Sequence, residues 1–106
     1  MKSNGTLPDF FRAIQHDPRI SVTHIGIYAA LTEHWRQHRR RNPVLAFSHE
    51  IMKLAKITAT RTYHKCIGDL HRYGYLRYEP SYNRNRGSRF YLVLPENQST
   101  DIKPKR

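Results

Sequence analysis

Apolar and polar positions follow a helical period through the first third of the chain and again over residues 48–73, and afterwards they alternate at a period of two. The first helix is predicted to start at Thr6, because a capping threonine is followed there by an early proline and an acid. Its apolar side comes from residues 10–14, and the pattern ends near Asp17. A short amphipathic helix is therefore expected first.

A longer helix is predicted between a cap at Ser21 or Thr23 and about His38. On a helical wheel its apolar side falls in one arc, made of Ile25, Tyr28, Leu31, Thr32 and Trp35. A lone aromatic residue on an apolar face is usually packed inside the protein. Trp35 is therefore expected to anchor the core rather than to stack on a ligand.

A helix-turn-helix is predicted in the middle of the chain. Its first helix, 48–54, is expected to be capped by Ser48, and residues 55–57 make a tight connection. Thr58 is expected to cap a second helix over about 58–73, because a threonine hydroxyl accepts one of the unpaired N–H groups at a helix start.

This second helix is strongly two-sided. At about 100° per residue, one side holds Ala59, Tyr63, Cys66, Ile67, Leu70 and Tyr73. The opposite side is narrow and basic, and consists of Arg61, Lys65, Gly68 and Arg72. The apolar side is expected to pack on a core, with the cysteine as an inert buried thiol, and the basic side to face outwards.

Two segments after Gly74, which supplies a left-handed helix stop, alternate at a period of two and are predicted to be strands: 75–78 and 89–94. Residues 80–88 between them are turn formers and arginines, so a hairpin is expected. Residues 44–47 are apolar enough to add a third strand. The predicted fold class is α+β, a winged helix-turn-helix with the order α-α-β-α-α-β-β and a three-stranded antiparallel sheet.

One domain is expected from the length of 106 residues, which can bury a modest core. The winged helix is assigned to residues 6–94. Residues 1–5 are predicted to be disordered and residues 95–106 to form a flexible basic tail. No internal repeat is present in the sequence.

The charge points to a polyanionic partner. Nineteen lysines and arginines against eight acids give a formal net charge of +11, and such a field attracts nucleic acid or an anionic membrane surface. The sequence has no apolar run of about 18 residues and no signal-peptide core, so no membrane partner is expected. A single cysteine fits a reducing compartment. A cytoplasmic, nucleoid-associated protein is expected.

Double-stranded DNA is the predicted partner, with the first half of the 58–73 helix in the major groove. The candidate contacts there are Thr60, Arg61, Thr62, His64, Lys65 and Arg72. The Arg-rich wing, 80–89, is predicted to lie along a phosphate strand or to enter a minor groove, through Tyr82, Asn83, Arg84, Arg86 and Arg89. The alternative is that both segments are ordinary solvated surfaces. Gly68 either lets a phosphate approach or is merely tolerated.

Other polar groups are weaker candidates. Residues 39–41 are three arginines. Three roles stay open for them: contact with a DNA backbone, non-specific binding of anions, or keeping the protein soluble. His34 and His38 have a zinc-like spacing, but no further ligand type accompanies them, so neither a metal nor a cofactor is expected. The carboxylates Glu50, Asp69 and Glu79 are assigned to helix ends and surface ion pairs, and no catalytic constellation appears. The chain is not expected to be an enzyme.

Residues 48–94 resemble winged helix-turn-helix regulators of bacteria. The resemblance is carried by residues 57–63, 70–76, 80–83 and 87–88, including the Leu-x-x-x-Gly-Tyr-Leu junction between helix and wing. More narrowly, residues 9–94 resemble small regulator-like proteins of bacterial genomes and integrated mobile elements. The resemblance implies DNA-binding transcription control, often as a homodimer. The chain has no effector domain like that of larger regulators, and no small-molecule ligand is evident.

Three rival functions remain open at this point. A winged-helix adaptor or accessory factor in replication, excision or transposition would dock a protein and needs an apolar exposed helix side. A single-strand binder would stack bases on Tyr75, Tyr78, Tyr82 and Tyr91. A metal-dependent nuclease is the enzymatic alternative.

Overall fold

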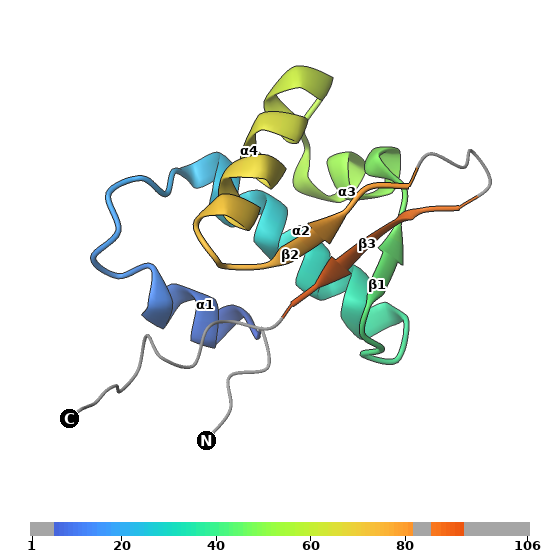
Figure 1. The fold of residues 1–106 in the computed structure, drawn as a ribbon, viewed down its shortest axis with the longest axis horizontal. Coiled ribbons are helices and arrows are strands. Elements are labelled where there is room, and N and C mark those ends of the chain that lie inside the picture. The colour runs from blue at the N-terminus through green and yellow to red at the C-terminus, as the bar shows by residue number, and fades with distance from the viewer. Residues whose placement is uncertain (1–5, 82–85, 93–106) are drawn as a thin grey trace.

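The computed structural model describes residues 6–81 and 86–92. Along this part of the chain the elements follow in the order α1, α2, β1, α3, α4, β2, β3 (Figure 1). Their bounds are Leu7–Ala13, Val22–Gln37, Val44–Ala46, Ser48–Ala55, Thr60–Arg72, Arg77–Glu79 and Ser88–Tyr91. The architecture is α+β with a three-stranded antiparallel sheet, as predicted. The predicted disordered end and basic tail lie outside the described residues.

The first two helices begin where the sequence indicated. The N–H of Asp9 donates to Thr6 Oγ1 at 3.3 Å, and the N–H of His24 donates to Ser21 Oγ at 3.5 Å. Ser21, and not Thr23, therefore caps α2. Helix α1 ends at Ala13, a turn earlier than predicted.

The predicted caps of the next two helices were wrong. Phe47 is the N-cap of α3, because the Glu50 carboxylate reaches back to accept its N–H at 2.8 Å, and this places Ser48 inside the helix. Lys56 ends α3 in the left-handed conformation with φ 62°. The connection after it stays non-helical through Ala59, which is the N-cap of α4, so Thr58 lies one position too early to cap.

Gly74 ends α4 as predicted, with φ 86°, in the region that glycine occupies without strain. The N–H of Tyr75 folds back to the carbonyl of Leu70 at 2.9 Å. Because this bond ties the chain to the helix end, strand β2 begins at Arg77 and not at the predicted Tyr75.

The sheet has the order β1-β3-β2, so the last strand lies in the middle. Phe90 faces Val44 on one side and Tyr78 on the other. Gly87 permits this arrangement, since a Cβ there would lie 2.6 Å from the carbonyl carbon of Ala46. The predicted addition of a first strand to the hairpin sheet is confirmed.

Helix α2 is the central element; it passes behind the sheet in Figure 1 and contacts α1, α3, α4 and β1. The core that surrounds it includes Phe10, Tyr28, Leu31, Ile51, Tyr63, Ile67, Leu70 and Phe90. Trp35 is 8% exposed and belongs to this core, as predicted. The apolar side of α4 is buried from Tyr63 to Leu70, whereas Ala59, before its first turn, is exposed. Burying each large side chain contributes about 1.5–3 kcal/mol.

Candidate nucleic-acid interface

The exposed side of α4 carries the predicted contacts of the second helix. Its amino-terminal turns project from the body of the molecule at the top of Figure 1. The side chains exposed along it are Thr60, Arg61, Thr62, His64, Lys65 and Arg72. No large apolar side chain interrupts this side of the helix, because the apolar positions of α4 all face the core.

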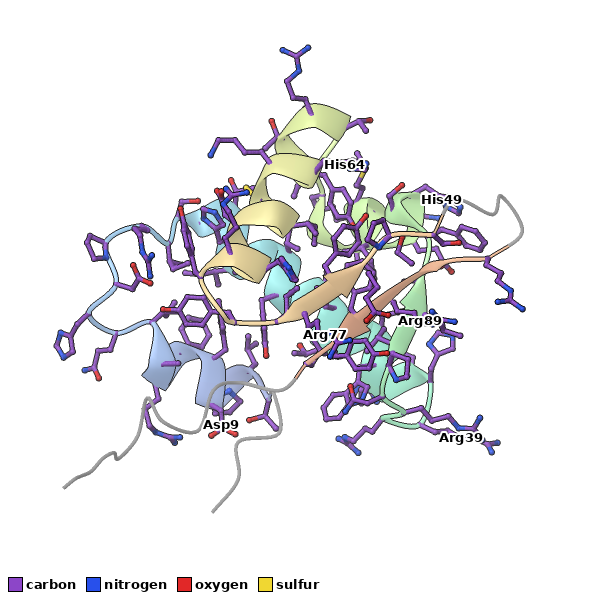
Figure 2. All side chains as sticks on the ribbon, in the orientation of Figure 1. Asp9, Arg39, His49, His64, Arg77 and Arg89 are labelled. Carbon is purple, nitrogen blue, oxygen red and sulfur yellow. The ribbon has the colours of Figure 1, made fainter. Side chains whose placement is uncertain are left out.

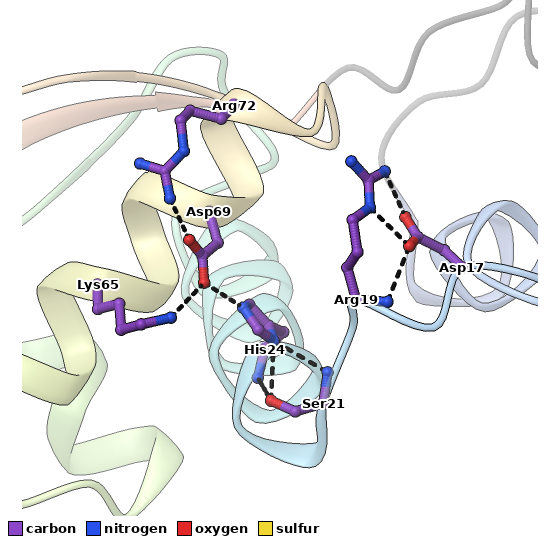
Figure 3. Close-up of polar contacts among 7 residues, drawn as sticks. All are labelled: Asp17, Arg19, Ser21, His24, Lys65, Asp69 and Arg72. Carbon is purple, nitrogen blue, oxygen red and sulfur yellow. Dashed lines mark hydrogen bonds and ion pairs between the residues drawn. The ribbon is translucent and has the colours of Figure 1, made fainter.

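A buried carboxylate organises the lower part of that side (Figure 3). Asp69 is 2% exposed, which contradicts its assignment to a surface ion pair. It accepts hydrogen bonds from His24 Nε2 at 2.9 Å and from Lys65 Nζ at 3.1 Å, and it pairs with Arg72. The hydrogen bond from His24 is the main cause that lowers the pKa of the Asp69 carboxyl, and it outweighs the opposing effect of burial.

The partner of Asp69 on α2 has a defined protonation. The backbone N–H of Ser21 donates to His24 Nδ1 at 2.9 Å, so Nδ1 must be the unprotonated nitrogen. With Nδ1 as an acceptor, Nε2 is the nitrogen that donates to Asp69. His24 thus joins the cap of α2 to the middle of α4, which the two sequence segments did not suggest.

The same geometry argues against a metal site at a nearby cluster of potential ligands. Ligand atoms of His24, Cys66 and Asp69 lie within 4.8 Å of one another. A metal would need a lone pair on Nε2, but that nitrogen carries the proton, and two cationic side chains already occupy the carboxylate. Burial raises the pKa of the Cys66 thiol, which keeps it in the poorly ligating neutral form. His24 and Asp69 are therefore a hydrogen-bonded structural pair, with the buried Cys66 thiol beside them.

Lys65 and Arg72 are thus held by Asp69, although their side chains are 73% and 63% exposed. A Cβ at Gly68 would lie 3.2 Å from the end of the Arg72 guanidinium, a flexible and mostly exposed group that can move aside. Both cations remain accessible to an anion, but a bound anion would compete with their ion pairs to Asp69.

Strands β2 and β3 contribute a separate set of charges. Arg77 donates to Glu79 at 2.6 Å, and Arg89 lies 3.8 Å from the same carboxylate, its cross-strand neighbour. Figure 2 places Arg77 and Arg89 together on the sheet, away from His64 on α4. Arg86 is exposed just before β3. The predicted contacts Tyr82, Asn83 and Arg84 lie outside the described residues.

Two cations that sequence reasoning missed come shortly before α4 in the chain. Lys53 is in the last turn of α3 and Lys56 is its cap residue, and both are exposed. Together with Arg61 in the first turn of α4, they make no ion pair with any residue of the described ranges. We call Lys53, Lys56, Thr60, Arg61 and His64 the α4 surface. The available signal was the position of these two lysines at the end of one predicted helix, a few residues before the next.

The start of α4 differs from the starts of the other helices in the described chain. Side chains of Thr6, Ser21 and Glu50 bond to backbone N–H groups at the first three helices. Ala59 gives α4 no side-chain cap, and its first turn contains no acid. The N–H groups of that exposed turn, together with the positive end of the helix dipole, are left to solvent or to an anion.

The stacking tyrosines needed by a single-strand binder are not presented together. Tyr75 is 2% exposed and its hydroxyl donates to Asp17 at 2.6 Å. Tyr78 stacks on Phe90 with ring centroids 5.1 Å apart, and Tyr91 lies under Arg77. Tyr82, the fourth residue of that hypothesis, lies outside the described residues.

Comparisons of the chain with protein-family models, with curated proteins and with solved structures found no match. Within residues 6–81 and 86–92, no helix has the length and apolar character that crossing a bilayer requires. The functional interpretation therefore depends on the chemistry of the surfaces themselves.

Proposed function

We propose that the chain is a winged helix that binds double-stranded DNA through the α4 surface and acts as a transcriptional regulator. The observation that carries this proposal is the amino-terminal end of α4. There an exposed, uncapped helix turn coincides with the unneutralised cations Lys56 and Arg61. Backbone N–H groups and cationic side chains are the groups with which proteins hold phosphates.

The polar character of the exposed side supports DNA over a protein partner. An adaptor helix would present apolar anchors to its partner, whereas α4 presents threonines, a histidine and cations. Arg61 is the candidate for a bidentate contact to a guanine, and Lys53 and Lys56 are candidates for phosphate contacts. An accessory role in replication or in mobile-element excision would use the same contacts and is the alternative within this proposal.

A salt titration tests the proposal. Fluorescence anisotropy with a mixed-sequence duplex should show log K falling with log salt at a slope of about −5, if about six phosphates are neutralised. Arg61→Ala should weaken binding by about 1–3 kcal/mol and relax sequence preference.

The matched control is Arg12→Ala, since Arg12 is an exposed, ion-paired arginine on α1, at the other end of the molecule. It should leave affinity nearly unchanged. A flat salt response, or equal losses in the two variants, would contradict the proposal. Selection of bound duplexes from a random library would then distinguish the roles, because a palindromic consensus indicates a symmetric dimer at an operator.

A further inference from the structure

A hollow of about 420 Å³ lies where the end of α2 turns into β1. It is lined by Trp35, Gln37, His38, Arg39, Arg41, Pro43, Val44 and Leu45; we call it the loop hollow. Figure 2 shows Arg39 at the lower right and His64 in the upper middle of the view, so the loop hollow is separate from the α4 surface. A DNA-binding role for α4 leaves this feature unexplained.

The chemistry of the loop hollow is divided between a floor and a rim. Trp35 and Val44 of the floor are buried core residues, while Leu45 beside them is 60% exposed. Arg39 and Arg41 on the rim are exposed and pair with no carboxylate of the described residues. Apolar contact area next to unneutralised guanidinium groups suits a molecule that is apolar at one end and anionic at the other.

The loop that carries the rim is held in one shape. Its N–H at Arg40 donates to the Trp35 carbonyl at 2.8 Å, and Asn42 Oδ1 accepts from the Leu92 N–H at 3.4 Å. The Arg40 guanidinium lies over the Trp35 ring, 5.8 Å from its centroid. Arg40 therefore covers the indole while its two neighbours line the loop hollow.

The backbone of this loop is strained. Arg39 and Arg40 have φ of 64° and 55°, a conformation that side chains with a Cβ rarely adopt. Consecutive left-handed residues other than glycine persist only where the surroundings fix them, and such positions are common at ligand sites. A rim that is already ordered loses little conformational entropy when it binds.

We propose that the loop hollow binds a small amphipathic anion, namely an apolar or aromatic body that carries a carboxylate or sulfonate. The body packs mainly on the exposed Leu45 and reaches only the small part of Trp35 that lines the loop hollow, and the anionic group accepts hydrogen bonds from Arg39 and Arg41. The site is independent of the proposed DNA contacts. It supplies the chain with a ligand site within the same domain, where the sequence alone showed none.

Trp35 makes the test direct, because it is the single tryptophan of the chain. We would titrate the protein with 2-naphthoate and follow the Trp35 emission, with neutral 2-naphthylmethanol as the matched ligand. Saturable quenching is expected for the anion, and binding at least about tenfold weaker for the neutral compound. Quenching that rises linearly without saturation, or equal affinity for both compounds, would overturn the proposal.

The protein variants locate the site. The double variant Arg39→Gln/Arg41→Gln keeps exposed polar side chains and should lower affinity for 2-naphthoate at least about tenfold, as should Leu45→Asp by placing an acid beside the anion. Arg12→Gln should bind like the unchanged protein. Retained affinity in the double variant would refute the assignment. A second result would also refute it. If a DNA duplex displaces 2-naphthoate from the unchanged protein and the double variant no longer binds that duplex, Arg39 and Arg41 are nucleic-acid contacts.

Discussion

The molecule carries two separate cationic surfaces, and they differ in shape and in the groups that surround the charge. The α4 surface is a convex helix side with free N–H groups at its first turn and no apolar floor. The loop hollow is concave, has Trp35 and Leu45 beneath its arginines, and is held by a strained backbone. Positive charge alone therefore does not identify the anion. The shape and the donors around the charge separate a polyanion from a small amphipathic molecule.

A second difference concerns how each surface is fixed. Lys65 and Arg72 on α4 are held by the buried Asp69, which is itself tied to α2 through His24. The loop arginines have no such carboxylate among the described residues, and only their backbone is held, through the Arg40 N–H and the Asn42 side chain. The predictions below change one surface at a time.

The largest effect is expected from Asp69→Ala. Removing the carboxylate leaves the buried His24 N–H without an acceptor, and such a group costs about 1–3 kcal/mol. Lys65 and Arg72 are mostly exposed, so they will be solvated and add little to the loss. Urea unfolding at pH 7 should therefore show a stability loss of about 2–3 kcal/mol, and an unchanged midpoint would mean that the network does not join α2 to α4.

The control variant Asp69→Asn separates charge from hydrogen bonding. Its amide oxygen can still accept from His24, so it should lose less stability than Asp69→Ala. Because the folded-state pKa of Asp69 is lowered, the charge stabilises above the unfolded pKa of about 3.9 and this contribution is lost as the pH falls through the folded pKa. The gap between the unchanged protein and Asp69→Asn should narrow between pH 5 and pH 2. A gap that is constant with pH would contradict the ionic contribution.

An intermediate effect is expected from capping α4. Ala59 already has the extended conformation of an N-cap, with φ −87° and ψ 110°. Ala59→Asp should raise stability by about 1 kcal/mol. It should also weaken duplex binding by about tenfold, because its carboxylate occupies the N–H groups and repels phosphate.

Ala59→Ser gives the matched neutral cap, with a similar gain in stability and a smaller loss of affinity. Binding of 2-naphthoate at the loop hollow should be the same in both variants. A more stable Ala59→Asp protein with unimpaired DNA binding would show that the first turn of α4 does not meet phosphate.

The smallest effect concerns His34, below the loop hollow. Both of its ring nitrogens are buried without a partner among the described residues, and burial lowers its pKa. The unfolded chain takes up a proton below about pH 6.5 while the native ring resists it. This stability is thus present above that pH and lost below it, by at most about 1.4 kcal/mol per pH unit.

His34→Leu should remove this pH dependence of the free energy of unfolding. The stability of the variant relative to the unchanged protein should therefore increase as the pH falls from 7 to 5. Unfolding in urea at pH 7, 6 and 5 measures it. The difference between the two proteins cancels the contribution of the other histidines. An advantage that stays constant with pH would mean that His34 does not resist protonation in the native protein.

The sequence pattern predicted most helices and strands, because the formation of each element depends mainly on residues close together in the chain. The helical period found the buried side of α4 from Tyr63 to Leu70, and Gly74 marked its end. The predicted start of α4 was wrong, because the chain stays non-helical through Ala59, which is the N-cap. A side chain two residues from the true start looked equally suitable in the sequence.

The site was less predictable because it depends on distant contacts. Asp69 looked like a surface acid, but its partner His24 is 45 residues away in the sequence. Lys53 and Lys56 lie at the end of α3, whereas Arg61 lies in the first turn of α4. The residues of the loop hollow were visible individually as Trp35 and an arginine run, but nothing local shows that Leu45 lies beside them.

Backbone amide NMR during titration with a short DNA duplex tests the central claim most directly. If the α4 surface meets DNA, the largest shifts will be at residues 56–65, including the N–H groups of the uncapped turn, and residues 38–45 of the loop hollow will be nearly unmoved. Shifts centred on residues 38–45, or no saturable shifts at residues 56–65, would contradict the assignment of the two surfaces.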